Sequence, residues 1–124
     1  MKRDWDTIRE ILAKLEDSES NRSFQLSSFP SDRAAEISYN MELLIEAGLV
    51  EGSMSKALGP GTHNFLAHRL TWSGHEFLDS IRSDAVWKKT KSSFISNGVS
   101  MTFDLVKSVA SEVAAAMIKA SMGI

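Results

Sequence analysis

The chain has 124 residues, no cysteine and a formal net charge of −2. This length predicts one domain with a single hydrophobic core. The absence of cysteine excludes a disulfide scaffold, a thiolate metal site and a cysteine nucleophile. Charged residues interrupt the apolar stretches, so the sequence predicts neither a secretory signal nor a membrane span, and we expect a cytoplasmic protein.

Charge is unevenly spread along the chain. Residues 1–49 hold six Lys or Arg and ten Asp or Glu, a net charge of −4, whereas residues 50–124 hold eight and six, a net charge of +2. A domain that neutralises several phosphates usually has a stronger basic stripe. The charge pattern therefore argues against tight non-specific binding to nucleic acid, although one local patch remains compatible with it.

The first half of the chain predicts two helices separated by a short strand. In residues 4–17 apolar side chains recur every three or four positions, the periodicity of a helix with one buried face. Residues 24–29 alternate apolar and polar side chains, which is typical of a half-buried strand. A helix over about 33–47 follows, with Ser31 or Asp32 as its N-cap and Gly48 in the left-handed conformation that ends it.

The second half predicts a hairpin and two further helices. Strands over 49–56 and 65–71 flank a turn rich in glycine and proline, and a helix over about 73–94 begins with Thr71 or Ser73 as its cap. Residues 96–100 break that helix, and a last helix runs over about 101–121. These elements predict an α+β fold that is mainly helical. We expect a winged-helix-like domain over residues 1–95, with the hairpin as its wing, and an extra C-terminal helix within 96–124.

Two motifs resemble known sequences. The stretch "AAEISYNMELLIEAGLVEG" resembles the second half of a winged-helix unit, in which a helix ends in Ala-Gly-Leu-Val and leads into the wing. The stretch "HRLTWSGHEFLDSIRSDAVWKKTK", together with "MKRDWDTIREIL" at the N-terminus, resembles a family of short bacterial and prophage proteins that share a domain of unknown function. This resemblance implies the winged-helix-like fold and supplies no activity.

The helix over 33–47 is the recognition helix if the domain binds double-stranded DNA. Side chains that read bases are usually Arg, Lys, Asn or Gln, and basic or polar side chains on a wing reach phosphate or the minor groove. An ordinary hairpin with solvated polar groups is the alternative for the wing. The predicted DNA contacts are Arg33, Asn40, Lys56, His63, Asn64 and Arg69.

A protein partner is the second hypothesis for the same helix. Tyr39 and Leu43 lie four residues apart, opposite the expected core face, where they either form a contact stripe for a partner or pack under the first helix. Three glutamates on this helix would repel phosphates. Both features favour a host or phage protein as the partner.

The last helix has a heptad-like seam with steps of three and four residues. Such a seam pairs with a second copy to form a homodimer, or it packs against the first helix of the same chain. We favour the dimer because the seam continues to the end of the helix. The predicted seam contacts are Phe103, Val106, Ala110, Val113 and Met117, followed by Ala120.

The sequence predicts no catalytic, cofactor or metal site. No serine lies in a nucleophile elbow, and His63, His68 and His75 are spaced more widely than the ligand pairs of zinc sites. We therefore expect a non-enzymatic binding protein, and the family resemblance implies a bacterial or phage origin. DNA binding or transcription regulation is the first expectation, and a protein interaction module, such as a phage factor that modulates a host protein, is the alternative.

Overall fold

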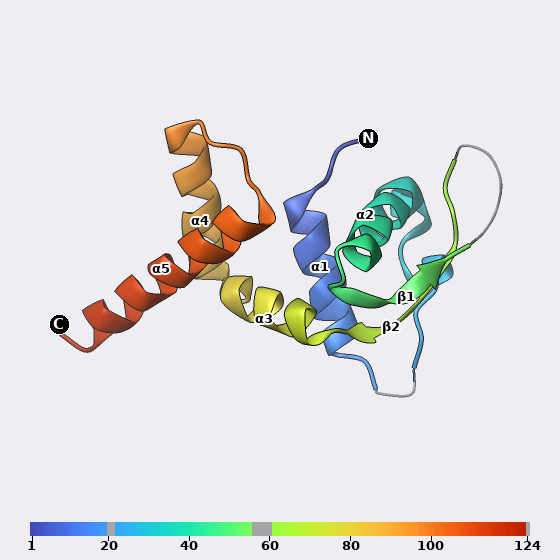
Figure 1. The fold of residues 1–124 in the computed structure, drawn as a ribbon, viewed down its shortest axis with the longest axis horizontal. Helices are drawn as coiled ribbons and strands as arrows, with labels where there is room; N and C mark the ends of the chain where they lie inside the picture. The colour runs from blue at the N-terminus through green and yellow to red at the C-terminus, as the bar shows by residue number, and fades with distance from the viewer. Residues whose placement is uncertain (20–21, 56–60, 124) are drawn as a thin grey trace. The chain divides into compact units, whose positions relative to one another are not determined.

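The computed structural model describes residues 1–19, 22–55 and 61–123. These residues form a mainly helical α+β fold, which confirms the predicted fold class (Figure 1). In chain order the elements are α1 (Trp5–Glu16), the 3-10 turns η1 (Leu26–Ser28) and η2 (Ser31–Arg33), α2 (Ala34–Glu46), β1 (Val50–Met54), β2 (Phe65–Leu70), α3 (Trp72–Ile81), α4 (Asp84–Asn97) and α5 (Phe103–Ser121).

Contacts within the chain group into two compact units, Met1–Glu76 and Phe77–Ile124. The predicted division after residue 95, between a winged-helix-like domain and an extra C-terminal helix, stays a prediction. None of the helices in the described part of the chain is long and apolar enough to cross a membrane.

The first unit is built around α1 and α2. Asp4 caps α1, since its Oδ1 accepts a hydrogen bond from the backbone N–H of Thr7 at 3.1 Å, and α1 packs against α2 and β2. The predicted cap of α2 by Ser31 or Asp32 is wrong: both residues lie in η2, and α2 starts after Arg33 without a side-chain cap. The buried side chains of the two helices are Ile8, Ile11, Leu12, Leu15, Ile37, Met41 and Leu44.

The predicted hairpin is confirmed, with strands somewhat shorter than expected. Gly48 has φ 76° and ends α2 as predicted, and β1 then pairs antiparallel with β2. The pairing shifts register between Glu51 and Gly52, so the hairpin contains a bulge that increases its local twist.

The predicted strand over 24–29 is wrong. Only Phe24 pairs with the hairpin, through backbone hydrogen bonds of 2.8 and 2.9 Å to Ala67. Side chains then take over the following backbone donors: Asn64 Oδ1 accepts from Leu26 N at 3.0 Å, and Ser28 Oγ accepts from Gln25 N at 3.0 Å. Such bonds compete with strand pairing, and the chain turns into η1 instead.

The junction between β2 and α3 depends on Thr71 and Gly74. Thr71 Oγ1 accepts a hydrogen bond from Gly74 N at 3.1 Å and donates one to the carbonyl of Gly48 at 2.6 Å, which confirms Thr71 as the cap. A Cβ at residue 74 would lie 2.0 Å from the carbonyl oxygen of Leu49. Gly74 therefore allows the start of α3 to pack directly against Leu49, which follows α2. This contact places the "TWSG" stretch beside the "AGLV" stretch in the fold.

The predicted single helix over 73–94 is wrong: this stretch forms two helices, α3 and α4. The chain breaks after Ile81, and Ser83 caps α4, because its Oγ accepts a hydrogen bond from Val86 N at 3.3 Å. Gly98, with φ 64°, ends α4, and Thr102 caps α5. α5 packs against α4.

Candidate interaction surface

The exposed side of α2 is acidic and partly apolar. α2 contains three glutamates and no Lys or Arg. Its outward-facing residues include Ala35, Glu42 and Glu46, which are exposed, and Tyr39 and Leu43, which are half-buried. The ring of Tyr39 and the side chain of Leu43 are therefore partly accessible to a partner.

Asn40 lies on the inner side of α2. Its side chain is 1% exposed; Oδ1 accepts a hydrogen bond from Asp4 N at 2.9 Å, and Nδ2 donates one to the Glu36 carbonyl at 2.9 Å. Both ends of the amide thus bind backbone groups inside the fold. This placement counts against the predicted base contact, which would require two buried hydrogen bonds to break.

Arg33 is held by two carboxylates. Its guanidinium donates to both oxygens of Glu10 on α1, at 2.8 and 2.6 Å, and also to Glu36 on α2. Thr7 Oγ1 donates to the same Glu36 carboxylate at 3.0 Å. The hydrogen bonds from Arg33 and then Thr7 lower the pKa of Glu36, and those to Glu10 and then Glu36 raise the pKa of Arg33. The predicted phosphate contact therefore competes with a network that joins α1 to α2.

The hairpin is attached to α2 by Ser38. Ser38 is 4% exposed; its hydroxyl donates to the His63 carbonyl at 2.7 Å and accepts from the His63 N–H at 3.1 Å. Beside this attachment is a cavity of about 270 Å³, which we call the α2 cavity. It is lined by Met1, Ala35, Ser38, Tyr39 and Glu42 and, from the hairpin side, by Gly61, Thr62 and His63.

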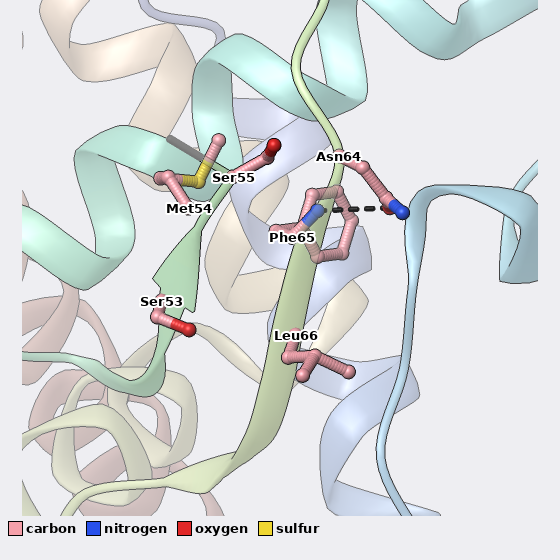
Figure 2. Close-up of a pocket in the computed structure, with 6 residues that line it drawn as sticks. All are labelled: Ser53, Met54, Ser55, Asn64, Phe65 and Leu66. Carbon is pink, nitrogen blue, oxygen red and sulfur yellow. Dashed lines mark hydrogen bonds between the residues drawn. The ribbon is translucent and has the colours of Figure 1, made fainter. Parts of the chain in front are cut away.

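A second cavity, of about 230 Å³, lies along the hairpin itself. Figure 2 shows its lining side chains, among them Asn64, whose Oδ1 accepts a hydrogen bond from Phe65 N at 2.8 Å. The same oxygen accepts the bond from Leu26 described above. Asn64 thus binds the segment around Leu26, which follows the pairing of Phe24 with β2, and Asn64 itself is exposed.

Two predicted wing contacts remain, Arg69 and Lys56. Arg69 forms an ion pair with Glu51 across the hairpin at 2.7 Å, and the neighbouring His68 Nδ1 is 2.9 Å from Ser23 Oγ. Lys56 lies outside the described residues. The structure thus places the side chains of four of the predicted DNA contacts, Arg33, Asn40, Asn64 and Arg69, in interactions within the protein, and it holds the backbone of a fifth, His63, against Ser38.

The seam of α5 divides into a covered half and an open half. Val106 and Ala110 are 0% exposed, and the ring of Phe103 stacks on that of Phe77 with centroids 4.8 Å apart. Val113 is half-buried and Met117 is 36% exposed. The first half of the predicted dimer seam therefore belongs to the core of its own unit, and Val113 and Met117 remain accessible to a second copy.

Metal ligation has no geometric basis in the described ranges. Within residues 1–19, 22–55 and 61–123, no three His, Asp or Glu side chains lie close enough together to hold a metal ion. His75 instead lies 3.7 Å from Glu16, Nδ1 to Oε2.

The sequence model of one family, described as hypothetical protein (DUF2513), matches residues 2–100. The chain belongs to this family. The match confirms the resemblance drawn from the sequence motifs, and it extends from α1 through α4 and ends before α5.

A relative of this DUF2513 protein occurs in Haemophilus influenzae, where it is described as "Uncharacterized protein". The two sequences are 39% identical over 119 residues, which are 95% of this chain and 99% of the relative. No solved structure matches the chain.

Proposed function

We propose that this DUF2513 protein is a non-enzymatic, winged-helix-like module that binds another protein through the exposed side of α2. The observation that supports this most is the composition of α2, which has three glutamates, no Lys or Arg, and an amide, Asn40, that is buried. A helix that enters the major groove lies between phosphates and reads bases with the side chains that α2 lacks.

Electrostatics oppose DNA on this side of the protein. Residues 1–76 hold eight Lys or Arg and twelve Asp or Glu, a net charge of −4. A carboxylate about 7 Å from a phosphate, at an effective dielectric constant of about 40, is repelled by about 1.2 kcal/mol. Glu42 and Glu46 are both exposed on α2, so a groove-bound α2 would meet this repulsion at least twice.

A protein surface with apolar and basic side chains complements the same helix. Tyr39 and Leu43 supply partly exposed apolar groups of the kind that form the centre of protein interfaces. Glu42 and Glu46 border them and would pair with Lys or Arg on the partner. The expected partner is therefore a protein with a basic contact surface.

DNA binding is the second candidate, and the order of elements favours it. The hairpin follows α2 directly and pairs with Phe24 through Ala67, as the wing of a winged-helix domain follows its recognition helix. The 3-10 turns η1 and η2 lie where such domains have a further helix. Winged-helix domains often bind DNA, but fold analogy is a weak guide to function.

Photo-crosslinking tests the proposal. A diazirine amino acid in place of Leu43 should give one discrete adduct in cells that naturally produce the protein, and the same group at Ser73, an exposed residue of α3, should not. The double variant Glu42→Lys/Glu46→Lys should weaken the adduct. In parallel, fluorescence anisotropy with mixed-sequence duplex DNA should show no binding at about 10 μM protein in low salt. Strong anisotropy changes without a protein adduct would favour the second candidate.

A further inference from the structure

We propose that the α2 cavity is an anchor pocket for one arginine side chain of the partner protein. This inference rests on the proposed function, because Tyr39 and Glu42 belong both to the exposed side of α2 and to the lining of the cavity. It adds the chemistry of the contact: a guanidinium group that enters between α2 and the start of β2.

The acidic side chain in the lining of the cavity, Glu42, favours a cation. Glu42 is exposed. Within the described ranges the Glu42 carboxylate has neither an ion pair nor a hydrogen bond with another residue. By contrast, Glu10 and Glu36 nearby along the helices are both bound to Arg33. Glu42 is therefore a carboxylate available to a partner, and a guanidinium binds a carboxylate through two parallel hydrogen bonds.

A second acceptor lies in the same lining. His63 Nδ1 is buried and has no hydrogen-bond partner among the described residues, although buried polar atoms are nearly always satisfied. When the neutral ring carries its proton on Nε2, Nδ1 is an acceptor. An arginine has five N–H donors, more than the Glu42 carboxylate alone accepts, and a rotation of the His63 ring would bring the buried Nδ1 to a remaining donor.

The aromatic ring of Tyr39 favours arginine over lysine. A guanidinium is planar, weakly hydrated and stacks on aromatic faces, whereas an ammonium is compact and strongly hydrated. The volume of about 270 Å³ lies just below the roughly 300–1,000 Å³ of pockets for drug-sized ligands. The size therefore suits one long side chain.

The wall of the cavity at His63 is fixed before a partner arrives. Both hydrogen bonds of Ser38 hold the backbone of His63 against α2. A pocket held in place in this way loses little conformational freedom on binding, which favours affinity from a small contact.

An NMR titration tests the anchor directly. Capped arginine amide, added to the ¹⁵N-labelled full chain, should shift the amide signals of Ser38, Thr62 and His63 and saturate with a Kd of about 1 mM, the affinity of a single anchor. Capped citrulline has the same shape without the charge and should bind at least about tenfold more weakly, the loss of one charge-assisted hydrogen bond. Capped lysine should also bind more weakly than arginine.

Two variants separate the cavity from the general charge of α2. Glu42→Gln should weaken binding of capped arginine about tenfold. Glu46→Gln removes an equal charge one turn further along α2, outside the lining, and should change the Kd by less than about twofold. Absence of a saturable shift, equal binding of citrulline, or equal effects of the two variants would each overturn the anchor pocket.

The outcomes separate this inference from the proposed function. A protein adduct at Leu43 without arginine binding in the cavity would keep the proposed function and end the anchor. Arginine binding without a protein adduct would end the docking of a partner on α2, and with it the role of the cavity as a partner's anchor.

Discussion

Replacing Gly74 by alanine should destabilise the first unit more than replacing Gly48 by alanine. The new Cβ would lie 2.0 Å from Leu49 O, whereas a C···O contact normally measures roughly 3.3 Å or more. The start of α3 must therefore move by about 1.3 Å from the end of α2. That movement stretches two hydrogen bonds made by Thr71: its N–H to Leu49 O, at 3.0 Å, and its hydroxyl to Gly48 O, at 2.6 Å.

The expected loss follows from these contacts. Overpacking contributes about 1–3 kcal/mol and the two hydrogen bonds about 1 kcal/mol each, while alanine in a helix recovers about 1 kcal/mol relative to glycine. The net loss in the free energy of unfolding is about 2–4 kcal/mol. Urea unfolding followed by tryptophan fluorescence measures it, with unchanged m-values as a check that the unfolding transition is the same.

Gly48→Ala is the matched control. Gly48 has φ 76°, but a Cβ there would have no heavy atom within 4 Å, so only the left-handed backbone is penalised, by about 1 kcal/mol. Gly74→Ala should therefore lose clearly more stability than Gly48→Ala. An equal or smaller loss would refute the close approach of α3 to the end of α2.

Three further predictions concern the helices. Asn40→Ala should lower the free energy of unfolding by about 1–2 kcal/mol in urea titrations, because the buried amide loses its hydrogen bonds to Asp4 N and to the Glu36 carbonyl; a loss below about 0.5 kcal/mol would mean that the amide is not structural. The pKa of Glu36 is held below its ordinary value of 4.5, chiefly by Arg33, so its contribution to stability is complete above about pH 4.5 and is lost as the pH falls through the lowered pKa. Glu36→Gln should flatten stability-versus-pH curves in that acidic range, and an unchanged curve would contradict the pairing. If α5 forms the dimer that its seam predicts, Met117→Glu should shift the mass in light scattering from dimer to monomer, whereas a wild-type monomer at high concentration would end the dimer hypothesis.

Local sequence patterns predicted those elements whose partners are close in the chain. Gly48 ends α2 and Thr71 caps α3 as predicted, because each depends on residues within the same turn or junction. The sequence pattern did not predict the break between α3 and α4, because apolar periodicity continues on both sides of Ser83. Only the hydrogen bond by which Ser83 caps α4 marks this boundary. The strand predicted over 24–29 failed because Asn64, far away in the sequence, takes the backbone donor of Leu26.

The candidate site depends still more on distant contacts. Asn40 looks like a base-reading amide until Asp4, 36 residues earlier, is placed against it. Arg33 looks like a phosphate contact until Glu10 on α1 is brought beside it. The α2 cavity exists only because Ser38 holds the chain at His63; a serine at a buried position of α2 was the one signal in the sequence that pointed to it.

The nature of the molecule that contacts Leu43 tests the central claim most directly. A diazirine side chain at residue 43 inserts into protein and nucleic acid alike, so the adduct formed in cells can be treated in parallel with protease and with nuclease. If a protein contacts α2, the adduct keeps its added mass after nuclease, and its protease digest contains peptides of a second protein joined to residue 43. An adduct whose added mass is removed by nuclease would show that α2 lies against nucleic acid and would contradict the account.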